Sequence, residues 1–72
     1  SIGLARKNNR LYVLHRVEKS ETLQAIAKKY GVSADDIRNA NLSQSDKLDI
    51  GAVLYVPYKK SRKDVYVSYD AE

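Results

Sequence analysis

Residues 22–41 form two short amphipathic segments joined by a turn, and this pattern constrains the fold more than any other stretch of the chain. In the first segment, apolar side chains recur at the i, i+3, i+4 and i+7 spacing of one helical face: Leu23, Ile26, Ala27 and Tyr30. Gly31 follows at the position where a helix commonly ends in a left-handed residue. The spacing therefore predicts a helix that ends at Tyr30.

The second segment begins with Ser33-x-x-Asp36, which has the form of a capping box. In a capping box, two side chains bond each other's backbone amides at the start of a helix. The inner face of this second helix would carry four residues: Ala34, Ile37, Ala40 and Asn41. Asn41 lies at the end of that face. There a short amide is expected to satisfy backbone groups rather than to contact a ligand.

Two segments rich in β-branched and aromatic residues, 11–17 and 53–56, flank the helical pair, and both are typical of strands. Pro57 is expected to end the second strand because proline cannot donate to a strand ladder. This order predicts an α+β fold of βααβ type, with two helices packed on one face of a two-stranded antiparallel sheet. The expected core is Leu23, Ile26, Ile37, Leu54 and Val56, with Leu48 and Ile50 divided between core and surface.

The composition excludes several classes of protein. With 72 residues the chain supports one small domain. Cys is absent and His15 is the only His, so disulfides, thiolate metal sites and the usual zinc sites are excluded, and no cofactor or metal is expected. No apolar run approaches the roughly 20 residues that a membrane span needs.

The excess positive charge lies at the two ends of the chain. Residues 15–57 carry six basic and six acidic side chains, so the formal charge of +4 comes from the flanks. We interpret residues 1–10 as a flexible lead-in, 11–58 as the folded domain and 59–72 as a basic tail with a possible extra strand at 65–69. Because the chain lacks an initiating Met, we expect a monomeric module of a longer protein.

A DNA-reading helix-turn-helix is an alternative interpretation of residues 22–41. Such a protein presents the first turn of its second helix to the DNA. Here that turn carries Asp35 and Asp36, which phosphates would repel and which a helix dipole stabilises with nothing bound. The two carboxylates therefore disfavour nucleic acid as a partner of the helical pair. A third hypothesis is that the basic flanks, 6–10 and 59–63, bind nucleic acid in a salt-sensitive way.

Three groups of residues carry a resemblance to a known family. They are His15-Arg16-Val17 with Ser20-Glu21-Thr22-Leu23 and Ile26-Ala27, then Gly31-Val32-Ser33 with Ile37 and Asn41, and finally Ile50-Gly51-Ala52-Val53-Leu54-Tyr55-Val56-Pro57. In this order they resemble the LysM domain, a βααβ module that binds peptidoglycan and chitin. The resemblance covers residues 15–57.

The resemblance implies a non-catalytic module that binds glycans containing N-acetylglucosamine and tethers a larger protein to peptidoglycan or chitin. It favours the cell envelope or the extracellular space, with an intracellular site left open. Two loops would frame the glycan, through residues Ser20, Glu21, Thr22, Leu23, Leu48, Asp49, Ile50 and Gly51. Loop backbone groups can pair with an acetamide, and aliphatic side chains can receive its methyl group.

Departures from the family pattern favour an alternative, a LysM-fold interaction or scaffold domain without glycan binding. Ser20 stands where the family has Gly, at a position expected to need unusual dihedral angles. Ala52 replaces Gln, and His15 replaces Tyr. Structural roles are also expected in the first loop: Ser20 and Thr22 as helix N-caps, and Glu21 in the first helical turn. No nucleophile–base pair is indicated, so we expect no catalysis.

Overall fold

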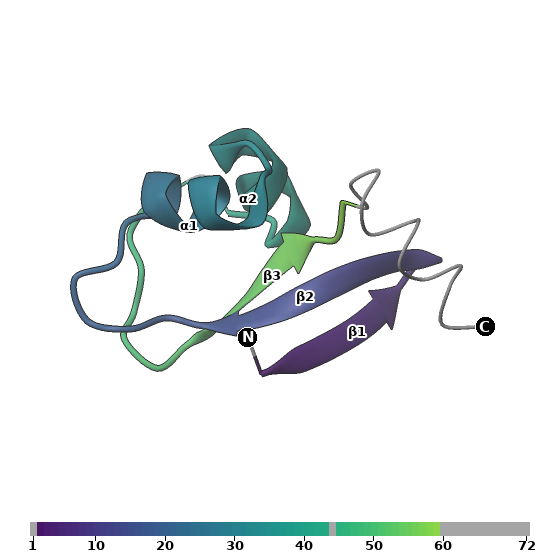
Figure 1. Ribbon diagram of the computed structural model, residues 1–72, viewed down its shortest axis with the longest axis horizontal. Coiled ribbons are helices and arrows are strands. Elements are labelled where there is room, and N and C mark those ends of the chain that lie inside the picture. The colour runs from purple at the N-terminus through teal and green to yellow at the C-terminus, as the bar shows by residue number, and fades with distance from the viewer. Residues whose placement is uncertain (1, 44, 60–72) are drawn as a thin grey trace.

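The computed structural model of the chain describes residues 2–43 and 45–59. Its elements are β1 (Gly3–Lys7), β2 (Arg10–Arg16), α1 (Leu23–Tyr30), α2 (Ala34–Ala40) and β3 (Val53–Pro57). Both helices lie on one side of an antiparallel sheet (Figure 1). The α+β class and the strand–helix–helix–strand order of the central region are therefore confirmed. No helix within the described ranges is long and apolar enough to cross a membrane.

The sheet has three strands, in the order β1-β2-β3, rather than the two that were expected. Residues 3–7 were predicted to be part of a flexible lead-in, and this was wrong: they pair with β2, from Gly3 opposite Leu14 to Lys7 opposite Arg10. Asn8 and Asn9 make the turn with positive φ angles of 53° and 64°, which asparagine tolerates better than most residues. Backbone pairing holds this largely exposed strand, so its sequence lacks an apolar alternation. The possible strand at 65–69 lies outside the described residues.

The caps predicted at Thr22 and Ser33 and the end of α1 at Tyr30 are confirmed. The Thr22 hydroxyl accepts a hydrogen bond from the Ala25 amide at 3.1 Å and caps α1. Gly31 ends α1 in the left-handed conformation, with φ 71°. Ser33 and Asp36 cap α2 reciprocally, with side chain to backbone distances of 3.0 and 3.2 Å. These local bonds satisfy amides that a helix start leaves unpaired.

The core lies between the two helices and the helix-facing side of the sheet. Ile26, Ile37 and Val56 are at most 1% exposed. The buried cluster consists of Leu23, Ile26, Ala27, Ile37 and Val56. Leu54 and Leu48 pack against the cluster but are only half-buried. Ile50 is 70% exposed. The expected core is thus confirmed apart from Leu54, which lies at its margin, and Ile50 belongs to the surface.

Asn41 joins the helical layer to the sheet. Its Nδ2 donates to the carbonyl of Ile37 at 2.6 Å and to that of Tyr55 at 2.8 Å. Its Oδ1 accepts from the Tyr55 amide at 2.8 Å. The side chain therefore closes the end of α2 and satisfies backbone groups on the outer edge of β3, which no strand covers among the described residues. The predicted structural role of this amide is confirmed.

Candidate functional site

The β2–α1 loop (17–22) and the α2–β3 loop (41–52) lie together at one end of the molecule (Figure 1). Two backbone hydrogen bonds join them: the Val17 amide donates to Ala52 O at 2.9 Å, and the Gly51 amide donates to Val17 O at 2.8 Å. Arg16 Nη1 adds a bond to Gly51 O at 3.1 Å. We call these two loops the loop pair. They contain seven of the eight residues that the sequence proposed as a site, and the eighth, Leu23, is the first residue of α1.

Ser20 and Thr22 have different roles in the first loop. Thr22 is the N-cap of α1, as predicted, whereas the prediction that Ser20 is also a cap was wrong. Ser20 instead has a φ of 70°, in the left-handed region that favours glycine. The expectation that this position requires an unusual backbone conformation is confirmed. Both side chains are exposed.

Glu21 points its carboxylate back into the protein rather than into solvent. Oε1 accepts from the Glu18 amide at 2.7 Å and lies 2.9 Å from His15 Nε2. Glu21 was expected in the first turn of α1, and this was wrong, because it precedes the N-cap and closes the loop. The Glu18 amide and then the His15 ring lower the pKa of Glu21. The carboxylate therefore organises the backbone of this loop.

His15 lies behind the loop pair and is only 4% exposed. Its Nδ1 lies 2.8 Å from the hydroxyl of Tyr30 in α1, and the two rings meet edge to face. A carboxylate only accepts, so in the neutral ring Nε2 donates to Glu21 and Nδ1 accepts from Tyr30. This chain of three side chains, with buried His15 at its centre, connects α1, β2 and the first loop. Sequence reasoning missed it, although alternation with Val13 and Val17 places His15 on the core face.

Three of the predicted site residues in the second loop are exposed: Asp49, Ile50 and Gly51. Gly51 has a φ of 87°, and Asp49 O accepts from the Ala52 amide at 3.0 Å to make a tight turn. Leu48 packs half-buried against the core. Leu23, the first residue of α1, is 3% exposed, so its side chain supports the site from beneath.

Arg38 of α2 anchors the second loop through Asp46. Nε and Nη2 of Arg38 lie 2.6 and 2.9 Å from the two carboxylate oxygens of Asp46, and Arg38 also contacts Asp35. Gln24 of α1 reaches the same carboxylate at 3.5 Å. The guanidinium lowers the pKa of Asp46. This anchor joins residues far apart in the sequence, and no local pattern could have predicted it.

None of the eight predicted residues lines either of two hollows, of about 480 and 270 Å³, although Leu42 and Ser43 of the second loop border the smaller one. Within the described part of the chain no three His, Cys, Asp or Glu residues gather as a metal site. Ser20, Thr22, Asp49, Ile50 and Gly51 are exposed, whereas Glu21, Leu23 and Leu48 are turned inward or partly covered. Such a surface suits an extended ligand better than an enclosed small molecule.

Comparison with known proteins agrees with this geometry. The sequence profile of the LysM domain matches residues 15–57. The chain is 38% identical over 56 residues to "LysM and putative peptidoglycan-binding domain-containing protein 2" of Danio rerio, covering 76% of this chain and 27% of that protein. It is 34% identical over 59 residues to "LysM and putative peptidoglycan-binding domain-containing protein 1" of Homo sapiens, covering 81% of this chain and 26% of that protein. The chain thus spans about a quarter of the length of these relatives. This chain belongs to the LysM domain family.

Proposed function

We propose that the chain is a non-catalytic module that binds glycans containing N-acetylglucosamine, of the peptidoglycan or chitin class, across the loop pair. The observation that carries the proposal is the joining of the two loops by the Val17–Ala52 and Gly51–Val17 hydrogen bonds. This joining holds the two loops side by side, so that their exposed backbone groups and small side chains can contact one extended ligand. The family membership and the names of the two relatives support the same class of ligand.

The exposed groups suit an acetamido sugar. The hydroxyls of Ser20 and Thr22 can exchange hydrogen bonds with sugar hydroxyls, and Ile50 offers an exposed apolar surface to the acetamide methyl group. Glu21 directs its charge inward, so it does not oppose a neutral ligand. Shallow contacts in water give weak binding, because each polar contact replaces one to solvent. Repeated engagement of a polymer by several modules would raise the effective affinity and tether a larger protein.

One observation favours a second candidate function, an interaction domain that retains the fold without binding glycan. Ser20 holds a left-handed backbone conformation and projects an exposed side chain where a glycine would leave the backbone open. A ligand that approaches this backbone closely would meet that side chain. The two functions are separated by whether the loop pair recognises the glycan at all.

A sedimentation experiment with insoluble chitin or peptidoglycan tests the proposal. We expect the 72-residue chain to be retained in the pellet, and Ile50→Asp to reduce retention several-fold because it places a charge on the apolar surface. Leu4→Asp is the matched control, since Leu4 is 59% exposed on β1, away from the loop pair. Equal losses in the two variants, or no retention of the unmodified chain, would overturn the proposal.

A further inference from the structure

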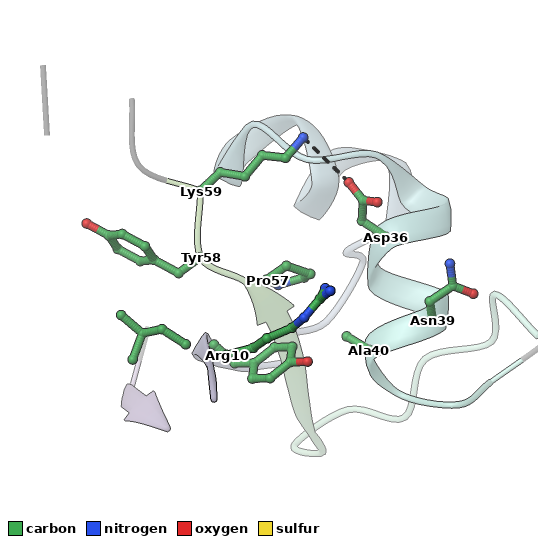
Figure 2. Close-up of a pocket in the computed structure, with 9 residues that line it drawn as sticks. Arg10, Asp36, Asn39, Ala40, Pro57, Tyr58 and Lys59 are labelled. Carbon is green, nitrogen blue, oxygen red and sulfur yellow. Dashed lines mark ion pairs between the residues drawn. The ribbon is translucent and has the colours of Figure 1, made fainter. Parts of the chain in front are cut away.

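A hollow of about 480 Å³ lies at the end of the molecule opposite the loop pair. Strand β2, helix α2 and the end of β3 all contribute to its walls (Figure 2). Its volume falls within the range of about 300–1,000 Å³ that is typical of ligand pockets. We call it the hairpin-end hollow. Its lining residues are Arg10, Leu11, Tyr12, Asp36, Asn39, Ala40, Pro57, Tyr58 and Lys59.

The strand register brings the basic N-terminal flank and Lys59 to this end. Lys7 lies opposite Arg10 beside the β1–β2 turn. Tyr12 lies opposite Pro57, and the Tyr58 amide donates to Leu11 O at 3.0 Å, so β3 ends next to the start of β2. The cations that meet here are therefore Arg6, Lys7, Arg10 and Lys59. The loop pair lies at the other end of the same strands (Figure 1).

The charged side chains of the hollow differ in whether they already have an oppositely charged partner. The Asp36 carboxylate accepts from the Ser33 amide at 3.2 Å and lies 3.7 Å from Lys59 Nζ, so it is neutralised locally. Arg10 forms no ion pair with any carboxylate among the described residues. Its side chain extends past Pro57 toward α2, where Asn39 and Ala40 form the facing wall (Figure 2). One cation thus stands unengaged within the described site, beside an apolar surface.

We propose that the hairpin-end hollow binds a linear peptide segment in which a carboxylate side chain neighbours an apolar one. The Arg10 guanidinium can bind a carboxylate through two parallel hydrogen bonds. Leu11, Pro57 and the ring of Tyr12 offer an apolar surface for the adjoining side chain. The exposed amide of Asn39 can pair with peptide backbone.

The local charges favour a peptide over a nucleic acid. A strand of phosphates needs a row of available cations. Here Asp36 lines the hollow, Asp35 precedes it on α2, and Lys59 is engaged by Asp36. A single carboxylate within an otherwise apolar or neutral segment needs only the Arg10 guanidinium, whereas a strand of phosphates would place further negative charges beside Asp35 and Asp36. The site is separate from the loop pair, so one module could hold a glycan at one end and a protein partner at the other.

Nuclear magnetic resonance titration of the 72-residue chain tests this inference. The probe is an acetylated, amidated tetrapeptide that alternates leucine with glutamate. Matched probes replace glutamate with glutamine or leucine with serine, and a uridine hexanucleotide represents nucleic acid. We expect the leucine–glutamate peptide to shift the amides of residues 10–12, 36–40 and 58–59, and to leave residues 20–22 and 49–51 unchanged. The two matched probes should bind several-fold more weakly.

Variants make the assignment specific. Arg10→Gln should weaken binding of the leucine–glutamate peptide about tenfold, because a charge-assisted pair is lost. Lys28→Gln makes the same charge change at an exposed position on α1 and should leave the affinity unchanged. The inference is overturned if Arg10→Gln has no effect, if the glutamine peptide binds equally well, or if the hexanucleotide binds these residues more tightly. None of these outcomes bears on glycan binding, which is followed through the loop pair.

Discussion

His15 Nε2 and Glu21 Oε1 lie 2.9 Å apart, and this contact joins a buried strand residue to the first loop of the loop pair. The same oxygen accepts the Glu18 amide at 2.7 Å, and the other ring nitrogen of His15 lies 2.8 Å from the Tyr30 hydroxyl. The conformation of residues 18–22 is therefore fixed from inside the protein. Exposed Ser20 and Thr22 are presented by a loop whose shape depends on the buried His15 and the partly buried Glu21 and Tyr30.

The first prediction concerns pH. The Glu18 amide and His15 lower the pKa of Glu21 below its ordinary value of 4.5 in the folded protein. Glu21 therefore contributes its full stabilisation above pH 4.5, and this contribution is lost as the pH falls through the lower folded-state pKa. Thermal unfolding followed between pH 7 and pH 3 should show a falling midpoint below pH 4.5.

Glu21→Gln supplies the control for this prediction, because glutamine keeps the shape but does not titrate. The variant should show a shallower fall of the midpoint at acid pH than the unmodified chain. Asp36 and Asp46 also have lowered pKa values, so part of the fall should remain. If the unfolding midpoint of Glu21→Gln falls with pH as steeply as that of the unmodified chain, Glu21 does not contribute to the loss of stability at acid pH.

The second prediction concerns His15. His15→Phe keeps a buried ring but removes both nitrogens, so Glu21 and Tyr30 lose their partner. We expect faster amide hydrogen exchange in residues 18–22, because the loop loses its connection to the sheet. Tyr30→Phe removes only the hydrogen bond between the Tyr30 hydroxyl and His15 Nδ1. It should lower the free energy of unfolding by about 1 kcal/mol and change hydrogen exchange in the loop less than His15→Phe does. Equal exchange rates in His15→Phe and the unmodified chain would contradict this account.

The third prediction concerns Asn41. Asn41→Ala removes the side-chain bonds to Ile37 and Tyr55 and leaves the amide and carbonyl of Tyr55 without their partner, whereas the Ile37 carbonyl keeps the backbone amide of residue 41. We expect the free energy of unfolding, measured by urea denaturation, to fall by about 2–3 kcal/mol. Asn39→Ala is a matched control on the exposed side of the same helix and should change stability by less than about 0.5 kcal/mol. Similar losses in both variants would exclude a bridging role for Asn41.

The fourth prediction concerns the left-handed residues of the loop pair. Ser20 has a φ of 70°, so Ser20→Gly should relieve a cost of about 1 kcal/mol, partly offset by the greater freedom of glycine when unfolded. The net gain should be about 0.5 kcal/mol, visible as a higher unfolding midpoint. Gly51 has a φ of 87°, so Gly51→Ala should lower the midpoint. A destabilised Ser20→Gly variant would contradict this account.

Local patterns predicted the parts of the fold that local interactions determine. The spacing from Leu23 to Tyr30, the cap at Thr22 and the capping box from Ser33 to Asp36 are each contained within a few residues. Strand β1 was missed because backbone pairing, rather than an apolar pattern, holds it against β2. Its signal was the pair Asn8-Asn9, which favours a tight turn.

The candidate site was predicted less completely than the fold. The family resemblance identified both loops, and the strand register places them together. The inward direction of Glu21, the chain of side chains through His15 and the Arg38–Asp46 anchor depend on tertiary contacts between separate elements. Such contacts leave no periodic pattern in a single sequence.

The most direct measurement of the central claim is an amide chemical-shift titration of the chain with an N-acetylglucosamine tetramer. The account predicts saturable shifts in residues 20–22 and 49–51, on both loops at once and with one shared dissociation constant. The amides of residues 6–10, 58 and 59 at the hairpin end should not move. Shifts confined to the hairpin end would contradict glycan binding by the loop pair. The absence of any amide shift, with both the N-acetylglucosamine tetramer and a muropeptide at millimolar concentration, would also contradict it.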